Sequence, residues 1–288
     1  MKTDTEIFSH NYGFTEGLRW HNGYLWFCDL WKKNIHCISP EGTELACYPM
    51  EDEPVALGWL SDGRMLASVL KSRKLLIQDN GQWSEYASLA MTTPGYAHDF
   101  TVSLKDTVYI STSGFYPAYK ANVTPSPILM VDSNQVLSVA VEDVAYPNGI
   151  VITPNQKFLI IAETFASRIS CYEIQKDGRL RWHSYLICFD TLGFKVYFDK
   201  QGIPIDKSRH CPDGICFDPF RQAIWVASPG KNQVLCVSLD GTILKNFSTH
   251  APPFDCQLDD TGNRLYIASS MMDPHRDTGN IEIIGNID

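Results

Sequence analysis

Three polar side chains each stand directly before a glycine, in the pairs Glu16-Gly17, Asn148-Gly149 and Asp213-Gly214. Carboxylate and amide oxygens of this kind are the ligands that Ca²⁺ and Mg²⁺ prefer. Glycine lets the backbone turn beside each of them. Any one pair could simply cap a turn, as Asn and Asp often do. The three form a metal site only if the surrounding elements bring them together.

Each pair opens one copy of a repeated β-hairpin, in which an apolar run, a turn and a second apolar run follow one another. Six hairpins begin at Gly17, Ala56, Asp99, Gly149, Gly214 and Asp255, with starts 39 to 65 residues apart. Propeller blades repeat at about 40–50 residues. We therefore predict an all-β fold with one domain over residues 1–288. It is a six-bladed β-propeller with four-stranded blades around a central channel.

The residues before the first hairpin and after the last together supply one further repeat unit. We expect a strand around Glu6-Ile7-Phe8 to pair with a strand at residues 281–285 and close the ring. Closure of this kind removes an exposed sheet edge.

The first strand of each propeller blade lines the channel. The residue before each hairpin then belongs to a ring at one mouth, made of Glu16, Val55, His98, Asn148, Asp213 and Phe254. Two carboxylates in one mouth would repel each other, and a divalent ion would relieve that repulsion. The second strands end at the same mouth and predict an outer polar ring of Asp29, Ser68, Ser111, Glu163, Ser228 and Ser269.

Composition excludes several classes of function. The chain carries a net charge of −9 and no Lys/Arg cluster, which argues against nucleic-acid binding. No run approaches the ~20 apolar residues of a membrane helix, and no signal peptide is visible. Nine cysteines without a CxxC pair predict reduced core residues in a cytoplasmic protein. The sequence leaves open whether the chain is a monomer or a dimer.

Two other motifs carry little weight. "HCPDGIC" brings His210, Cys211 and Cys216 together, but structural zinc needs a second pair of ligands that the sequence lacks. No GxSxG occurs, so nothing supports a serine-hydrolase mechanism.

The segments "TEGLRWHNGYLWFCDL", "PNGIVITPNQKFLIIAETFASRI" and "PDGICFDPFRQAIWVA" resemble the signature segments of the senescence marker protein, gluconolactonase and luciferin-regenerating enzyme family. The resemblance implies that Glu16, Asn148 and Asp213 bind one divalent metal ion, which could be Ca²⁺, Zn²⁺, Mg²⁺ or Mn²⁺. It also implies hydrolysis of a small-molecule lactone. The metal would polarise the ring carbonyl, and Asp213 would act as the base for water.

The chain departs from the family's pattern at two positions. His98 stands where members usually carry Asn, and Tyr96 stands where sugar lactonases carry Arg. His98 could be a fourth metal ligand, which would favour Zn²⁺ or Mn²⁺, or a general acid or base, or a hydrogen-bonding wall residue. We favour its contact with substrate or metal-bound water. The residues we expect at the substrate are Tyr96, His98, Asp99, Phe115 and Glu163, with Asp29 and Ser228 behind them.

Two stretches exceed the repeat, at residues 115–127 and 189–212. Long ordered loops are often lids, although surface decoration is equally compatible with the sequence. Their aromatic residues suggest a less polar substrate, and ordinary packing would also explain them; they are Phe115, Tyr116, Phe194, Tyr197 and Phe198.

Two other functions fit the same residues. The metal site could serve organophosphate hydrolysis or ring isomerisation. Alternatively, the protein could be a propeller that binds a cation or ligand without catalysis, because a fold alone does not determine function.

Overall fold

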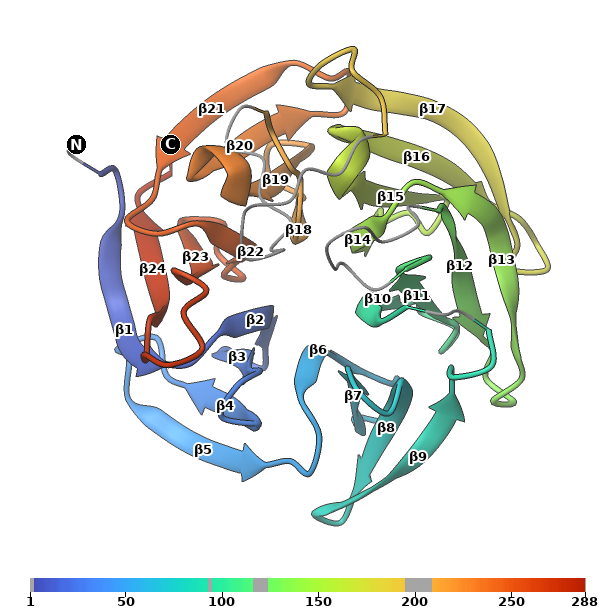
Figure 1. Cartoon of the computed structure of the whole chain (residues 1–288), viewed down its shortest axis with the longest axis horizontal. Helices are drawn as coiled ribbons and strands as arrows, with labels where there is room; N and C mark the ends of the chain where they lie inside the picture. The colour runs from blue at the N-terminus through green and yellow to red at the C-terminus, as the bar shows by residue number, and fades with distance from the viewer. Residues whose placement is uncertain (1–2, 93–94, 116–123, 195–208, 288) are drawn as a thin grey trace.

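The computed structural model describes residues 3–92, 95–115, 124–194 and 209–287. These residues form six four-stranded antiparallel sheets arranged in a ring (Figure 1). The fold is a six-bladed β-propeller, as the hairpin repeat predicts.

The first three blades follow one another along the chain. Blade 1 contains β2 (Thr15–His21), β3 (Tyr24–Asp29), β4 (Asn34–Ile38) and β5 (Glu44–Pro49). Blade 2 contains β6 (Pro54–Trp59), β7 (Met65–Val69), β8 (Lys74–Asp79) and β9 (Gln82–Ser88). Blade 3 contains β10 (Ala97–Val102), β11 (Val108–Thr112), β12 (Ser126–Val131) and β13 (Leu137–Val144).

The other three blades complete the ring. Blade 4 contains β14 (Pro147–Ile152), β15 (Phe158–Glu163), β16 (Arg168–Ile174) and β17 (Leu180–Cys188). Blade 5 contains β18 (Ile215–Asp218), β19 (Ala223–Ser228), β20 (Gln233–Ser238) and β21 (Ile243–Ser248). Blade 6 contains β22 (Pro253–Leu258), β23 (Arg264–Ser269), β24 (Gly279–Gly285) and β1 (Glu6–Tyr12). Two short 3₁₀ turns follow β15 and β19, at Thr164–Ala166 and Pro229–Lys231.

The ring closes through a strand from the start of the chain. β1 is the outer strand of blade 6 and pairs antiparallel with β24, with Glu6 opposite Ile283 and Ile7 opposite Glu282. The closure predicted from the sequence is therefore confirmed, and the two ends of the chain lie near each other (Figure 1).

The apolar core lies between neighbouring blades. Inner strands are covered on both faces, and every residue of β7 and of β19 is buried. Such strands show continuous apolar sequence, whereas outer strands such as β5 alternate between exposed and half-buried positions. Gly58 permits one close contact, because a Cβ atom there would lie 2.6 Å from the Phe100 ring of the next blade.

Much of the two long stretches lies outside the described residues, including Tyr116, Tyr197 and Phe198. The described ends pack inward, since Phe115 and Phe194 join Tyr146 and Phe165 in one aromatic cluster. Across the described segments, no helix has the length and apolar character needed to cross a membrane.

Candidate metal and substrate site

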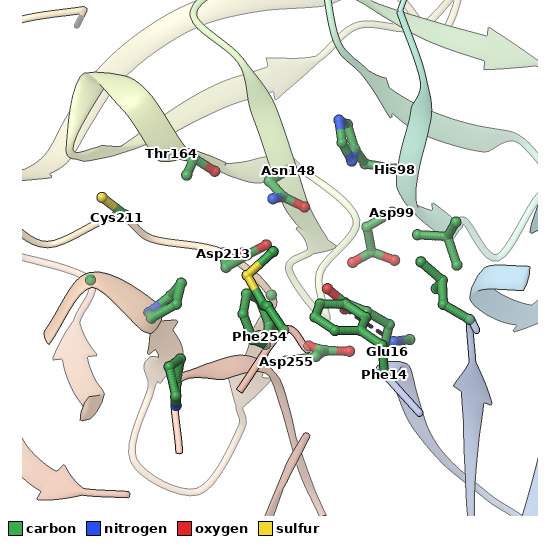
Figure 2. A pocket seen from close by; sticks show the side chains of 18 of the residues that line it. Phe14, Glu16, His98, Asp99, Asn148, Thr164, Cys211, Asp213, Phe254 and Asp255 are labelled. Carbon is green, nitrogen blue, oxygen red and sulfur yellow. Dashed lines mark hydrogen bonds between the residues drawn. The ribbon is translucent and has the colours of Figure 1, made fainter. Parts of the chain in front are cut away.

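One mouth of the channel opens into a cavity of about 670 Å³. Glu16, His98, Asn148 and Asp213 all line it, each at the start of the first strand of its blade or just before it. Figure 2 shows Glu16, Asn148 and Asp213 gathered around the same space. The structure therefore brings together the three residues that the glycine pairs single out.

Close backbone packing around the channel explains the glycines. Gly17 has a φ of +59°, and a Cβ atom there would lie 2.4 Å from the carbonyl oxygen of Val55 in the next blade. A Cβ atom on Gly149 would lie 2.3 Å from the carbonyl oxygen of Asp213. The Gly149 amide also donates a 3.2 Å hydrogen bond to that oxygen. Only glycine lets the first strands approach this closely while their polar side chains turn into the channel.

Two further carboxylates, Asp99 and Asp255, also line the cavity. They occupy equivalent places in blades 3 and 6, and each accepts a hydrogen bond from the first strand of the next blade. Asp255 accepts a 2.7 Å bond from the Leu18 amide, and Asp99 accepts one from the Ile150 amide. The floor of the cavity thus holds four acids, and Asp255 is the one of them that the sequence analysis did not name.

Arg19 is the cation beside this floor. Its guanidinium donates to the Asp99 carboxylate and, at 2.9 Å, to the carbonyl oxygen of Phe100. Its Nη1 lies 3.7 Å from Asp255 Oδ2. The sequence analysis missed both Arg19 and Asp255. A signal was available, because Asp255 opens the sixth hairpin as Asp99 opens the third, and Arg19 interrupts an otherwise apolar run.

The four acids disfavour one another's ionisation. Burial raises the pKa of Glu16 well above its usual value, and the nearby Asp213, Asp255 and Asp99 add to the effect. Burial and the charges of Asp255 and Asp99 likewise raise the pKa of Asp213. Burial raises the pKa of Asp255 to about 7, although Arg19 opposes this. One guanidinium does not compensate four carboxylates.

His98 is held in an apolar setting at the edge of the floor. Its ring lies 5.2 Å from the Tyr146 ring, and burial lowers the pKa of His98 to about 4. The imidazole is therefore neutral at pH 7. Its buried Nε2 has no hydrogen-bond partner among the described residues, and neither has Asp99 Oδ2. Buried polar atoms without partners are costly, so both atoms point to a group that binds here.

The floor suits a divalent cation. It offers carboxylate and amide oxygens from Glu16, Asn148 and Asp213, and its uncompensated negative charge would be relieved by two positive charges. Within the described segments, the pKa of the Asp213 carboxylate is raised by burial and by Asp255 and Asp99, and no hydrogen bond to it contributes, which leaves its oxygens open for a ligand.

Other predicted residues lie away from the cavity lining. Glu163 is fully buried and accepts hydrogen bonds from the Ala145 amide at 3.0 Å, from Arg168 Nη2 at 2.6 Å and from the Ser170 hydroxyl. Phe115 lies behind the lining residues Tyr146 and Phe165, with its ring centroid 5.3 Å from that of Tyr146 and 6.5 Å from that of Phe165.

Asp29 and Ser228 lie behind the lining. The Asp29 carboxylate accepts hydrogen bonds from the Gly13 amide at 2.8 Å and the Phe14 amide at 3.2 Å, so it fixes the segment that carries Phe14 to the cavity. The Ser228 hydroxyl lies 3.0 Å from His210 Nδ1, within hydrogen-bonding distance.

A separate group of potential ligands lies on the outer half of blade 1. His36, Glu44 and Cys47 place ligand atoms within 4.8 Å of one another. His36 is buried on β4, while Glu44 and Cys47 are exposed on β5. A metal-binding measurement must therefore distinguish this group from the channel floor.

Comparisons with known proteins agree with this architecture. The sequence profile described as the SMP-30/gluconolactonase/LRE-like region matches residues 14–271. Lactonase drp35 of Staphylococcus aureus strain MW2 is 24% identical over 240 residues, which cover 78% of this chain and 67% of the relative.

Solved structures share the fold at low sequence identity. A luciferin-regenerating enzyme has a TM-score of 0.76 at 14% identity and covers 98% of this chain and 96% of its own. A gluconolactonase from Xanthomonas campestris has a TM-score of 0.74 at 18% identity, covering 96% of this chain and 88% of its own. A calcium-binding regucalcin from Agrobacterium tumefaciens strain C58 has a TM-score of 0.73 at 18% identity, covering 96% of this chain and 93% of its own.

Proposed function

The chain belongs to the SMP-30/gluconolactonase/LRE-like family, and on that basis we propose that it hydrolyses lactones in the channel cavity. Glu16, Asn148 and Asp213 would hold one divalent metal ion. The observation that carries the proposal is the floor itself, where the buried Asp99, Asp213 and Asp255 and the half-buried Glu16 converge beside the Arg19 guanidinium. The name of the drp35 relative and that of the Xanthomonas campestris neighbour support the choice of lactones.

A bound divalent ion supplies Lewis-acid chemistry, which polarises a carbonyl group and makes water more acidic. The chain's own residues have distinct tasks in this scheme. Glu16 and Asn148 would provide oxygen ligands to the ion. The Asp213 carboxylate would accept the proton of the attacking water, since among the described residues no hydrogen bond contributes to its pKa.

His98 orients the substrate or water in this proposal. Because its imidazole is neutral at pH 7, one ring nitrogen donates a hydrogen bond and the other accepts one. The unpartnered Nε2 is available for the lactone or for water. Asp99 and Asp255, tied to Arg19 and to backbone amides, hold the floor rigid beneath the reacting atoms.

The test measures hydrolysis of a small-lactone panel by the purified chain after chelation, and again after adding Ca²⁺, Mg²⁺, Mn²⁺ or Zn²⁺ separately. We expect activity to vanish with chelator and return with at least one metal. Glu16→Gln should raise the metal concentration needed for half activity. Glu44→Gln is the matched control, because it alters the separate group on blade 1.

Two results would contradict the proposal. Hydrolysis that survives chelation would remove the metal from the scheme. Calorimetric metal binding that Glu16→Gln weakens, without turnover of any lactone, would instead favour a propeller that binds a cation without hydrolysing lactones. A metal requirement lost in Glu44→Gln but kept in Glu16→Gln would relocate the metal to blade 1.

A further inference from the structure

The cavity has an apolar side above its acidic floor. This apolar arc comprises Phe14 and Leu30 of blade 1, Val55 and Leu70 of blade 2, and Phe254 and Met271 of blade 6. These blades are neighbours in the ring (Figure 1). Apart from the floor acids Glu16 and Asp255, every described lining residue from these three blades is apolar.

The strand register explains how the arc forms. Phe14 lies two residues before Glu16, so side-chain alternation aims both toward the channel. Leu30 and Leu70 directly follow the second strands of blades 1 and 2. Glu53, which directly precedes β6 as Phe14 precedes β2, is instead paired with Lys71 at 2.6 Å and is absent from the lining.

Aromatic packing makes the arc a fixed surface. The Phe14 ring lies 4.6 Å from the Phe254 ring and 5.3 Å from the Trp31 ring. At the outer rim, Met271 keeps 63% of its surface exposed. An apolar ligand that enters the cavity would therefore cover surface that is now in contact with water.

The polar lining residues above the floor come from the other side, which also carries the aromatic rings of Tyr96, Tyr146 and Phe165. Lys231 and Asn232 come from blade 5 and Thr164 from blade 4, and the Thr164 hydroxyl already donates a 2.8 Å bond to the Pro212 carbonyl. A polyhydroxylated lactone placed against the apolar arc would lose hydrogen bonds to water without replacing them.

We infer that the substrate is a lactone whose ring carries an apolar substituent, an alkyl chain or an aryl ring, which packs on the apolar arc while the ester group lies over the acidic floor. This inference rests on the proposed lactone hydrolysis. A cavity of about 670 Å³ falls in the range of about 300–1,000 Å³ that holds ligands larger than a bare lactone ring. Each methylene buried on the arc should raise kcat/KM about fourfold.

The experiment compares δ-lactones that carry alkyl chains of none, one, three and five carbons with glucono-δ-lactone, using the metal-loaded protein. We expect kcat/KM to rise by about fourfold per carbon until the arc is covered, and to be lowest for glucono-δ-lactone. A flat series, or a preference for glucono-δ-lactone, would overturn the apolar substrate while leaving lactone hydrolysis intact. Absence of turnover for every member would overturn both.

Variants assign the effect to the arc. Leu70→Ser should lower kcat/KM about tenfold for the longest chain and less than twofold for the unsubstituted ring. Met271→Ser alters a side chain that is 63% exposed, so we expect the variant to fold, and it should reduce the chain-length dependence in the same direction. Leu104→Ser is the matched control, because Leu104 is 78% exposed and does not line the cavity. Equal losses for short and long chains in both arc variants would refute the assignment.

Discussion

Carboxylates are buried both on the channel floor and at places in the blades away from the cavity, but their surroundings differ. On β24 of blade 6, Glu282 accepts hydrogen bonds from the Ser269 hydroxyl at 2.6 Å and the His250 amide at 2.9 Å. Asp218 accepts bonds from the Trp225 indole and the Phe220 amide, both at 3.0 Å. In the channel, the acids face one another, and their pKa values rise as a result.

The difference separates structural acids from functional ones. A buried carboxylate that receives several donors is stabilised as an anion and holds neighbouring strands in place. A buried carboxylate surrounded by other carboxylates destabilises the fold unless a cation joins it. Burial alone would not have distinguished Glu163 from Asp213, whereas the count of donors does.

The largest effect should follow from Asp213→Asn. The amide keeps one oxygen for the metal but cannot take a proton from water, so turnover should fall by about 10²–10⁴-fold. Thermal unfolding of the chelated variant should occur at the same or a higher temperature, because one repelling charge is gone. Steady-state kinetics on a confirmed lactone and a melting curve measure both effects. Wild-type turnover would exclude Asp213 as the base.

Arg19→Met should be the most destabilising change in the channel. Removing one partner from buried ion pairs costs about 3–5 kcal/mol of unfolding free energy. Here the loss leaves Asp99 without the guanidinium that contacts it. Denaturant unfolding gives the value, and Arg64→Met is the control, because its pair with Asp62 is exposed and should contribute little. A loss no larger than that of the control would show that the floor does not need its cation.

The chelated protein should become less stable as pH rises from about 4 to about 7. The folded-state pKa of Asp255 is raised to about 7, so the folded protein holds more protons than the unfolded chain in this range. Stability therefore falls with pH, by about 2–4 kcal/mol in total for this group. Melting curves of the wild-type protein and of the Asp255→Asn variant across this pH range show how much of the pH dependence of stability comes from Asp255. A divalent ion should suppress it, and equal slopes in both proteins would contradict the assignment.

Glu163→Gln should act in the opposite way to Asp213→Asn. It leaves Arg168 without its anionic partner and should lower the unfolding free energy by about 1–3 kcal/mol. Turnover of the folded variant should stay within about twofold of wild type, because Glu163 does not line the cavity. A large loss of turnover with unchanged stability would restore Glu163 as a substrate contact.

Much of this fold could be predicted from the hairpin repeat. The repeat length, the turn residues and the apolar runs are local features of the sequence. They predict six blades, the closing strand, and a mouth of the channel shared by Glu16, Asn148 and Asp213. The repeat also accounts for Gly17, Gly149 and Gly214, because each lies at the start of its hairpin, where blades 1, 4 and 5 contact the next blade closely.

The rest of the site could not be predicted from the repeat, because it depends on strand register and on side-chain contacts. The first strands of five blades begin with a register irregularity, and in β10 and β22 two consecutive residues line the cavity, so Asp99 and Asp255 join the floor beside His98 and Phe254. The sequence analysis placed Asp99 at the substrate, but counting one residue per blade missed Asp255. Glu163 ends the second strand of blade 4 at the same mouth. Its carboxylate does not line the cavity, because it accepts hydrogen bonds from the Ala145 amide, Arg168 and Ser170.

The pairing of β1 with β24 also bears on how the chain reaches its native state. Five blades consist of adjacent hairpins, whereas this pair joins residues separated by nearly the whole sequence. Closing so long a loop costs about 3 kcal/mol more entropy than closing a ten-residue hairpin. During synthesis, β1 must wait for its partner strand to emerge from the ribosome. Until then blade 6 is incomplete, and its open sheet edges are where a misfolding chain would first associate with another.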